Sequence, residues 1–262
     1  MNLKYITCSD PRNHNSIEEM FGLWRIDPRV EIAVQMHPKK VSPETERYKW
    51  ICEMLHQLTI RKGDYNFAVH INKDWCIDLV KGYYIPKELD DILHAKKPLG
   101  GDIPLVKRIQ LNMPQTAVNE FNPHVVKSVV DYFRDQGQEV IFQYNNLTKD
   151  AVEQLHQTGA EFSLLFDASG GRGELPKSWE SPIYPGQHMQ GYAGGLKPDN
   201  VSENLDKIAK VAGECDTYID AEGGLQSPTG ELKPDGKPVK LFNSARAAEY
   251  IQAALAWEQK AR

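Results

Sequence analysis

The chain has 262 residues, of which 40% are hydrophobic and 26% are charged, and its formal net charge is −5 at pH 7. This acidic balance gives no electrostatic reason to expect a nucleic acid or an anionic membrane as a partner, since phosphate backbones favour clustered Lys and Arg. No apolar run reaches the roughly 18 to 20 residues that span a bilayer, and residues 1–10 lack the apolar core of a signal peptide. We therefore expect a cytoplasmic enzyme or binding protein.

The four cysteines, Cys8, Cys52, Cys76 and Cys215, are scattered along the chain and form no CxxC pair. This spacing favours free thiols in a reducing compartment over a disulfide framework. The histidines and acidic residues also lack the spacing of a metal ligand set, so we expect no metal.

Apolar runs of strand length alternate with helical patterns from one end of the chain to the other. The predicted strands span residues 3–8, 30–36, 65–71, 106–111, 139–144, 161–167, 188–193 and 215–220. Nearly continuous apolar runs separated by helices are typical of parallel strands that helices cover.

The helical patterns between these runs begin and end at recognisable signals. The predicted helices span residues 16–24, 43–58, 86–94, 122–134, 148–157 and 198–211, and a last helix begins at residue 243 or 244. Ser16 and Asn122 are typical N-cap residues, and Pro123 suits a first helical position. Gly159 and Gly213 are typical stops after a helix.

Eight strand and helix units in one chain predict a single α/β domain over residues 1–262, folded as a (β/α)8 TIM barrel. A doubly wound open sheet is the alternative, but its usual GxGxxG after the first strand is absent, where the chain reads ITCSDPRNHN. Residues 73–104 form a long insertion after the third strand, predicted to be a lid or an extra packed loop. Residues 224–240 are predicted to be an extended irregular loop after the eighth strand, on the active face.

In a barrel of this kind the carboxyl ends of the strands face the site, and side chains alternate in direction along each strand. Polar residues that gather at strand ends are typical of a ligand pocket rather than of a packed core. The candidates at these ends are Cys8, Gln35 or His37, His70 or Asn72, Gln110 or Asn112, Gln143 or Asn145, Asp167 and Asp220.

Two pairs of glycines follow the last two predicted strands. Gly194 and Gly195 stand just before the helix start at Pro198, so backbone N–H groups and the helix dipole can face an anion there. Gly223 and Gly224 offer a second turn about thirty residues later. Because barrels build phosphate sites from their last two strand-to-helix loops, we predict that a small phosphorylated substrate binds here.

Six segments carry a resemblance to a known family: YITC (5–8), FAVHIN (67–72), IQLN (109–112), LLFD (164–167), AGGLKPDNV (193–201) and IDAEGG (219–224). Together they are similar to phosphoribosylanthranilate isomerases, barrels of tryptophan biosynthesis that convert an aminoaldose into an aminoketose by an Amadori rearrangement. The match is closest at AGGLKPDNV, with IDAEGG following at the right distance.

The resemblance implies a role for each matching residue. Cys8 is the general base that takes the proton from C2 of the sugar, and Asp167 is the general acid that opens the ribose ring. It also implies a monomer or homodimer that uses neither a metal nor an organic cofactor. The residues expected to contact the substrate are Asn72, Gln110, Asn112, Lys40 and Asp220, with Gly194, Gly195, Gly223 and Gly224 at the phosphate.

The chain also departs from the family's pattern. Glu222 places a carboxylate in the second glycine turn, so either its side chain points away from the phosphate or the ligand carries a different charge. The family's arginine after the second strand is missing, and Lys39 or Lys40 can supply charge there but no bidentate fork. Ser9 and Asp10 stand where the family has glycine after the cysteine.

Two other classes of function therefore stay open. The first is another enzyme on the same phosphate-binding barrel, such as an epimerase, aldolase or lyase that uses Asp167 or Asp220 and His70. The second is a barrel that binds a phosphorylated metabolite without turning it over.

Overall fold

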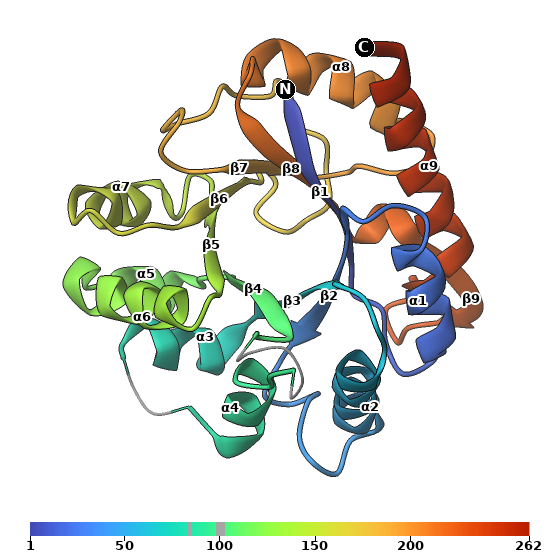
Figure 1. Cartoon of the computed structure of the whole chain (residues 1–262), viewed down its shortest axis with the longest axis horizontal. Helices are drawn as coiled ribbons and strands as arrows, with labels where there is room; N and C mark the ends of the chain where they lie inside the picture. The colour runs from blue at the N-terminus through green and yellow to red at the C-terminus, as the bar shows by residue number, and fades with distance from the viewer. Residues whose placement is uncertain (83–84, 98–102, 262) are drawn as a thin grey trace.

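A computed structural model describes residues 1–82, 85–97 and 103–261. Its eight parallel strands form a closed barrel in chain order, in which the last strand pairs with the first (Figure 1). The strands are β1 (Asn2–Ser9), β2 (Val30–Met36), β3 (Asn66–Ile71), β4 (Val106–Leu111), β5 (Glu139–Tyr144), β6 (Ser163–Phe166), β7 (Gln190–Ala193) and β8 (Asp216–Ala221). The predicted TIM barrel is confirmed.

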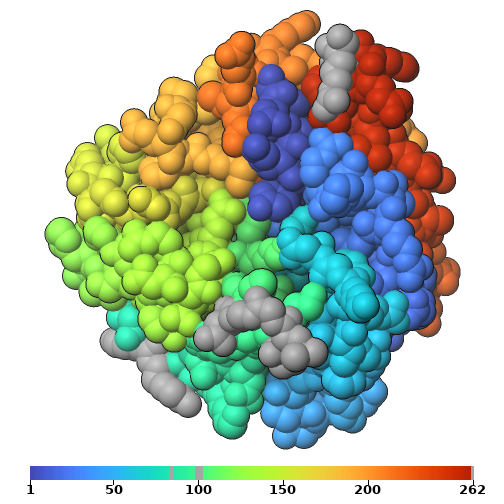
Figure 2. Space-filling view, in the orientation of Figure 1, coloured from blue at the N-terminus to red at the C-terminus, as the bar shows by residue number. Residues whose placement is uncertain are grey.

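Helices surround this ring of strands. They are α1 (Ile17–Trp24), α2 (Glu46–Ile60), α3 (Lys73–Val80), α4 (Lys87–Leu93), α5 (Gln115–Asn119), α6 (Pro123–Asp135), α7 (Lys149–Gln157), α8 (Val201–Ala212) and α9 (Ser244–Ala261). None of these helices is long and apolar enough to cross a membrane. Figure 2 shows the colours running once round the molecule, so that the C-terminal helix lies beside the N-terminal elements.

The predicted caps explain where several helices begin and end. The Ser16 hydroxyl accepts a hydrogen bond from the Glu19 N–H, and the Glu19 carboxylate accepts one from the Ser16 N–H, which completes a capping box. Asn122 caps α6 through its side-chain oxygen. Helices α3 and α5, with 8 and 5 residues, were not predicted, and neither has a side-chain cap hydrogen bond.

The segment after β3 does not form a lid over the carboxyl ends of the strands. It contains α3 and α4, and then an isolated antiparallel bridge joins Lys96 to Pro104. Ile103 and Pro104 line a cavity with Lys107, at the start of β4, which places this part of the segment at the opposite end of the barrel. The lid prediction is therefore wrong for the described part, and its Tyr83, Tyr84, Gly100 and Gly101 lie outside the described residues.

The loop after β8 is ordered, in contrast to the prediction of an irregular loop. A short 3-10 turn, η1 (Gly223–Leu225), leads into an antiparallel hairpin of β9 (Gln226–Leu232) and β10 (Pro238–Phe242). Gly236, at φ 78°, closes the connecting turn with an N–H to Lys233. The strands of this hairpin are mostly exposed and polar, so they lack the apolar run that predicts a strand.

The barrel has an apolar outer layer and a polar inner one. The outward residues of each strand, such as Ile32, Val69 and Ile109, pack against the helices in one continuous core. The inward residues form a small apolar cluster of Ile141, Leu165, Ala193 and Tyr218. Charged groups fill the barrel on one side of this cluster, and the candidate site lies on the other.

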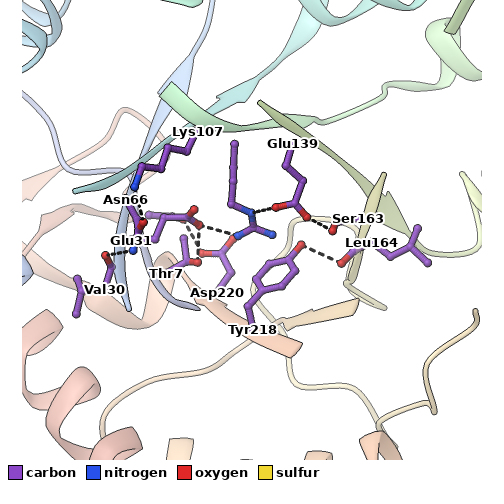
Figure 3. A network of polar contacts seen from close by, with 12 residues as sticks. Thr7, Val30, Glu31, Asn66, Lys107, Glu139, Ser163, Leu164, Tyr218 and Asp220 are labelled. Carbon is purple, nitrogen blue, oxygen red and sulfur yellow. Dashed lines mark hydrogen bonds and ion pairs between the residues drawn. The ribbon is translucent and has the colours of Figure 1, made fainter. Parts of the chain in front are cut away.

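Arg108 is 1% exposed and occupies the barrel interior near the start of the strands. Its guanidinium donates to Glu31 at 3.0 Å and to Glu139 at 2.8 Å, and Thr7 donates to the same Glu31 oxygen at 2.8 Å. Ser163 donates to Glu139. Figure 3 shows these side chains converging inside the ring from strands β1, β2, β5 and β6.

The guanidinium of Arg108 is also sandwiched by two aromatic rings. Its central carbon lies 4.4 Å from the Tyr5 ring centre and 4.1 Å from that of Tyr218, which are distances of cation–π contact. Tyr218 is held in turn by its hydroxyl, which donates to the Leu164 carbonyl at 2.9 Å. These contacts offset part of the cost of removing a charge from water.

Replacing Arg108 with Met should destabilise the protein strongly, because two carboxylates would be left in the barrel without their cation. We expect a loss of about 3–5 kcal/mol in the free energy of unfolding, measured by urea denaturation. Lys107→Met is the matched control, since Lys107 makes its ion pair with the exposed Asp64 and should cost less than about 1 kcal/mol. Equal losses in the two variants would contradict this account of the interior.

Candidate active site

A cavity of about 330 Å³ opens at the carboxyl ends of the strands. Its wall contains inward side chains from the ends of β2 to β6 and β8, and it is closed by the turns after β6, β7 and β8. The sequence-predicted residues that line it are Gln35, His70, Asn72, Gln110, Asn112, Gln143, Asp167, Gly194, Gly195, Asp220, Gly223 and Gly224. The structure thus brings most of the predicted site together.

Cys8 is the main exception. Its side chain is 0% exposed and belongs to the outer core, where Tyr250 of α9 is its neighbour. Thr7 and Ser9, on either side of it, point into the barrel instead. Burial raises the pKa of the Cys8 thiol, with the charges of Asp220 and Glu31 adding to the rise. The predicted general-base role of Cys8 is therefore wrong, since the thiol neither reaches the cavity nor favours the thiolate.

Lys40 also lies outside the site. It is exposed in the turn after β2 and does not line the cavity. His37 and Asn145 do not line it either. The cation that does is Arg172, in the long β6–β7 loop, where no strand end in the sequence predicts a site residue.

The turn after β7 needs glycine on conformational grounds. Gly194 and Gly195 have φ angles of 110° and 65°, which side-chain-bearing residues rarely adopt. A Cβ on Gly194 would lie 2.8 Å from the Glu174 carbonyl oxygen, and one on Gly195 would lie 2.7 Å from the Leu175 nitrogen. The β6–β7 loop therefore packs directly onto this turn.

The turn after β8 needs glycine at only one of its two positions. A Cβ on Gly224 would lie 2.0 Å from the Leu196 carbonyl oxygen, whereas nothing lies within 4 Å of one on Gly223. Gly224 thus allows the two glycine turns to touch. Among the described residues, the N–H groups of Gly195, Gly223 and Gly224 have no recorded acceptor, so they are available to an anion in the cavity.

Asp220, at the end of β8, is buried and lines the cavity. Burial raises the pKa of Asp220 to about 8. The Ser9 hydroxyl, which donates to its carboxylate at 2.6 Å, opposes this rise. The nearby carboxylates of Glu222, Glu31 and Asp167 add to the rise. A carboxyl with this pKa is protonated at neutral pH and can donate a proton.

Glu222 stands at the mouth of the cavity and turns away from the glycines of the β7 loop. The Gln35 amide, on β2, donates to its carboxylate at 2.9 Å. Burial is the largest effect on Glu222 and raises its pKa. The charge of Asp10 raises this pKa further, whereas Arg12 and Arg47 lower it. Its contact with solvent at the mouth moderates these effects. Of the two alternatives that the sequence left for Glu222, the structure favours a side chain that points away from the predicted phosphate.

Asp167 lines the cavity, but its carboxylate is already occupied by its own loop. One oxygen accepts from the Ser169 N–H at 3.1 Å and from the Ser169 hydroxyl at 2.7 Å, and the other accepts from the Gly171 N–H at 2.6 Å. These hydrogen bonds tie the Asp167 side chain to the β6–β7 loop and shape that loop. Across the ranges that the structure describes, no three His, Cys, Asp or Glu side chains are grouped to hold a metal ion.

The sequence matches no known protein-family model and no curated protein. Among solved structures, it is similar to a chain of the tryptophan synthase α2β2 complex from Pyrococcus furiosus, with 10% identity, a TM-score of 0.52, and coverage of 97% of this chain and 99% of that chain. A 3-hexulose-6-phosphate synthase from Salmonella typhimurium aligns with 11% identity, a TM-score of 0.48, and coverage of 97% and 99%. The first likeness supports the barrel, and at this identity it shows the fold alone.

The two adjacent glycines after β8 allow a matched test of the turn. Gly224→Ala should lower the free energy of unfolding by about 1–3 kcal/mol, because its methyl group would overlap the Leu196 carbonyl. It should also weaken the binding of inorganic phosphate, measured by calorimetry. Gly223→Ala should change both by little, and similar effects of the two substitutions would contradict the described contact.

The raised pKa of Asp220 should make stability depend on pH. Because the folded pKa of about 8 lies above the ordinary value of 3.8, the wild type loses stability as pH rises from about 4 to about 8. Asp220→Asn should therefore gain stability relative to the wild type across this window, by up to about 1.4 kcal/mol per pH unit. Urea unfolding at pH 5, 7 and 9 measures the difference.

Asp216→Asn is the control for that series, since Asp216 is exposed at the other end of β8 and pairs with Lys4. It should change stability by less than about 1 kcal/mol at every pH. If the difference between wild type and Asp220→Asn stays constant from pH 5 to pH 9, the carboxyl of Asp220 titrates normally and is not the proton donor.

Proposed function

We propose that the protein is an acid–base isomerase of a small phosphorylated sugar, of the phosphoribosylanthranilate isomerase type, with Asp220 as its proton donor. The observation that carries the proposal is the position of Asp220, a buried carboxyl protonated at neutral pH, in the same cavity as two touching glycine turns. An aldose–ketose rearrangement needs these two elements together: an anchor for the phosphate and an acid at the sugar ring.

The phosphate binds to the free N–H groups of Gly195, Gly223 and Gly224, with Arg172 as the cation at the rim. This anchor fixes the sugar across the cavity from β7 and β8 towards β2 and β3. The position of Glu222 is compatible with this phosphate anchor, because its carboxylate accepts a hydrogen bond from Gln35 on β2 and not from the glycine turns.

The proton transfers follow from the state of each carboxyl. Asp220 gives its proton to the ring oxygen, which opens the ring and leaves an imine at C1. A carboxylate then takes the proton from C2 to give an enolamine and returns it to C1, while the hydroxyl at C2 gives its proton back to the Asp220 carboxylate, which leaves the aminoketose and restores both carboxyls. Glu222 is the better base of the two remaining carboxylates, because its pKa is raised and, among the described residues, only the Gln35 amide donates to it, whereas three donors already occupy Asp167.

Turnover of phosphoribosylanthranilate, followed by the loss of its fluorescence, tests the proposal, with ribose 5-phosphate as a second aldose. Asp220→Asn should lower kcat by about 10²–10⁴-fold, the usual contribution of a general acid. Glu222→Gln should lower it in the same range, and kcat/KM should fall above pH 8 as Asp220 loses its proton.

Cys8→Ala is the control that separates this assignment from the one based on the sequence. Because the thiol is buried between β1 and α9, this variant should retain wild-type kcat even if it is less stable. Loss of turnover in Cys8→Ala with normal folding would restore the thiol as base. A wild type that binds phosphate but isomerises neither sugar would instead support a binding protein or another enzyme class.

A further inference from the structure

A row of four side-chain amides crosses the wall of the cavity between β4 and β8. Each amide donates its N–H to the oxygen of the next, and the last one donates to a carboxylate. In order, Gln110 donates to Asn112 at 2.8 Å, Asn112 to Asn72 at 3.0 Å, Asn72 to Gln35 at 2.7 Å, and Gln35 to Glu222 at 2.9 Å. The row thus has a single direction.

This direction is fixed by groups that cannot exchange donor for acceptor. The Asn72 nitrogen can only donate and lies 2.7 Å from the Gln35 oxygen, so the nitrogen of the Gln35 amide must face Glu222. The Asn72 nitrogen also donates to two backbone carbonyls, those of His70 at 2.9 Å and Met36 at 3.2 Å. Turning either amide round would place oxygen against oxygen, so the hydrogen positions along the row follow from the network.

The same reasoning fixes the tautomer of His70. The Gln35 nitrogen that faces Glu222 also lies 3.2 Å from Nδ1 of His70. Because this nitrogen can only donate, Nδ1 must accept, and the single proton of the neutral ring must be on Nε2. The amide row therefore determines which nitrogen of the His70 ring carries the proton.

His70 Nε2 has no recorded partner among the described residues. The ring lines the cavity and Nε2 is not sealed inside the protein, so this atom is reached from the cavity side. Burial lowers the pKa of His70 to about 3, Arg108 lowers it further, and Asp10 opposes this. The ring consequently stays neutral and presents an N–H to the cavity.

We infer that His70 is a further catalytic residue, a neutral donor whose Nε2–H binds the sugar oxygen at C2 as it changes from hydroxyl to carbonyl. A neutral imidazole polarises such an oxygen without competing with the carboxylic acid that transfers the proton. Gln35 and the rest of the row are positioning residues. This inference rests on the proposed function, since it assigns His70 to the same rearrangement.

The tautomer can be measured without any turnover. In long-range ¹H–¹⁵N spectra of protein labelled at histidine, we expect His70 to show a protonated Nε2 and an unprotonated Nδ1 from pH 5.5 to pH 8.5. Gln35→Glu should move the proton to Nδ1, because a carboxylate there can only accept. Gln143→Glu adds the same charge to the cavity wall with no recorded contact to His70, and it should leave the tautomer unchanged.

Two substitutions of His70 distinguish a donor from a packing residue. Gln places an N–H near the position of Nε2 and should keep kcat within about tenfold, whereas Asn replaces only the Nδ1 end and should lower kcat about 10²–10³-fold. Melting temperatures of the two variants should be similar, which separates this effect from a loss of stability.

The inference is overturned if His70 carries its proton on Nδ1, is charged at neutral pH, or if the Gln and Asn variants lose kcat equally. Should the wild type isomerise neither sugar, the proposed function fails by that result. The inference then depends on binding of ribose 5-phosphate: a downfield shift of the His70 Nε2–H on addition of the sugar phosphate supports it, and an unchanged resonance rejects it.

Discussion

The structure depends on a charge at a place where barrels usually pack branched aliphatic residues. Arg108 lies inside the ring of strands, where Glu31 and Glu139 neutralise it and two tyrosine rings enclose its guanidinium. A buried cation of this kind is tolerable only if its partners surround it, and these come from strands on several sides of the barrel. The ion pairs and the two ring contacts therefore require that β1, β2, β4, β5 and β8 all stand in their observed register.

The same interior charges act on the candidate site at the other end of the strands. Arg108 contributes to keeping His70 neutral, and Glu31 contributes to raising the pKa of Asp220. Desolvation is the larger cause in both cases. The barrel thus supplies a poorly solvated interior in which a carboxylic acid and a neutral imidazole persist at neutral pH.

Glycines and amides divide the cavity into two halves with different chemistry. The glycine turns after β7 and β8 present backbone N–H groups, which suit an anion. The amides on β2, β3 and β4 form a directed row that ends on Glu222, which suits hydroxyl and carbonyl oxygens. Because Glu222 belongs to the second half, a carboxylate in the β8 turn and a phosphate at the glycines do not exclude each other.

The sequence by itself determined the strand order, the barrel and the set of residues near its carboxyl ends. Every predicted strand lies within two residues of its observed bounds, because parallel strands are short apolar runs whatever surrounds them. It did not determine which side of β1 faces the cavity, since both faces of a barrel strand are buried and Cys8 and Ser9 are equally plausible at its end. In the closed ring Ser9 faces inward, where it donates to Asp220, and Cys8 faces outward into the core under the helices. The state of Asp220, the tautomer of His70 and the contact between the glycine turns were likewise decided only by the tertiary structure, because burial and hydrogen bonds between distant strands set them.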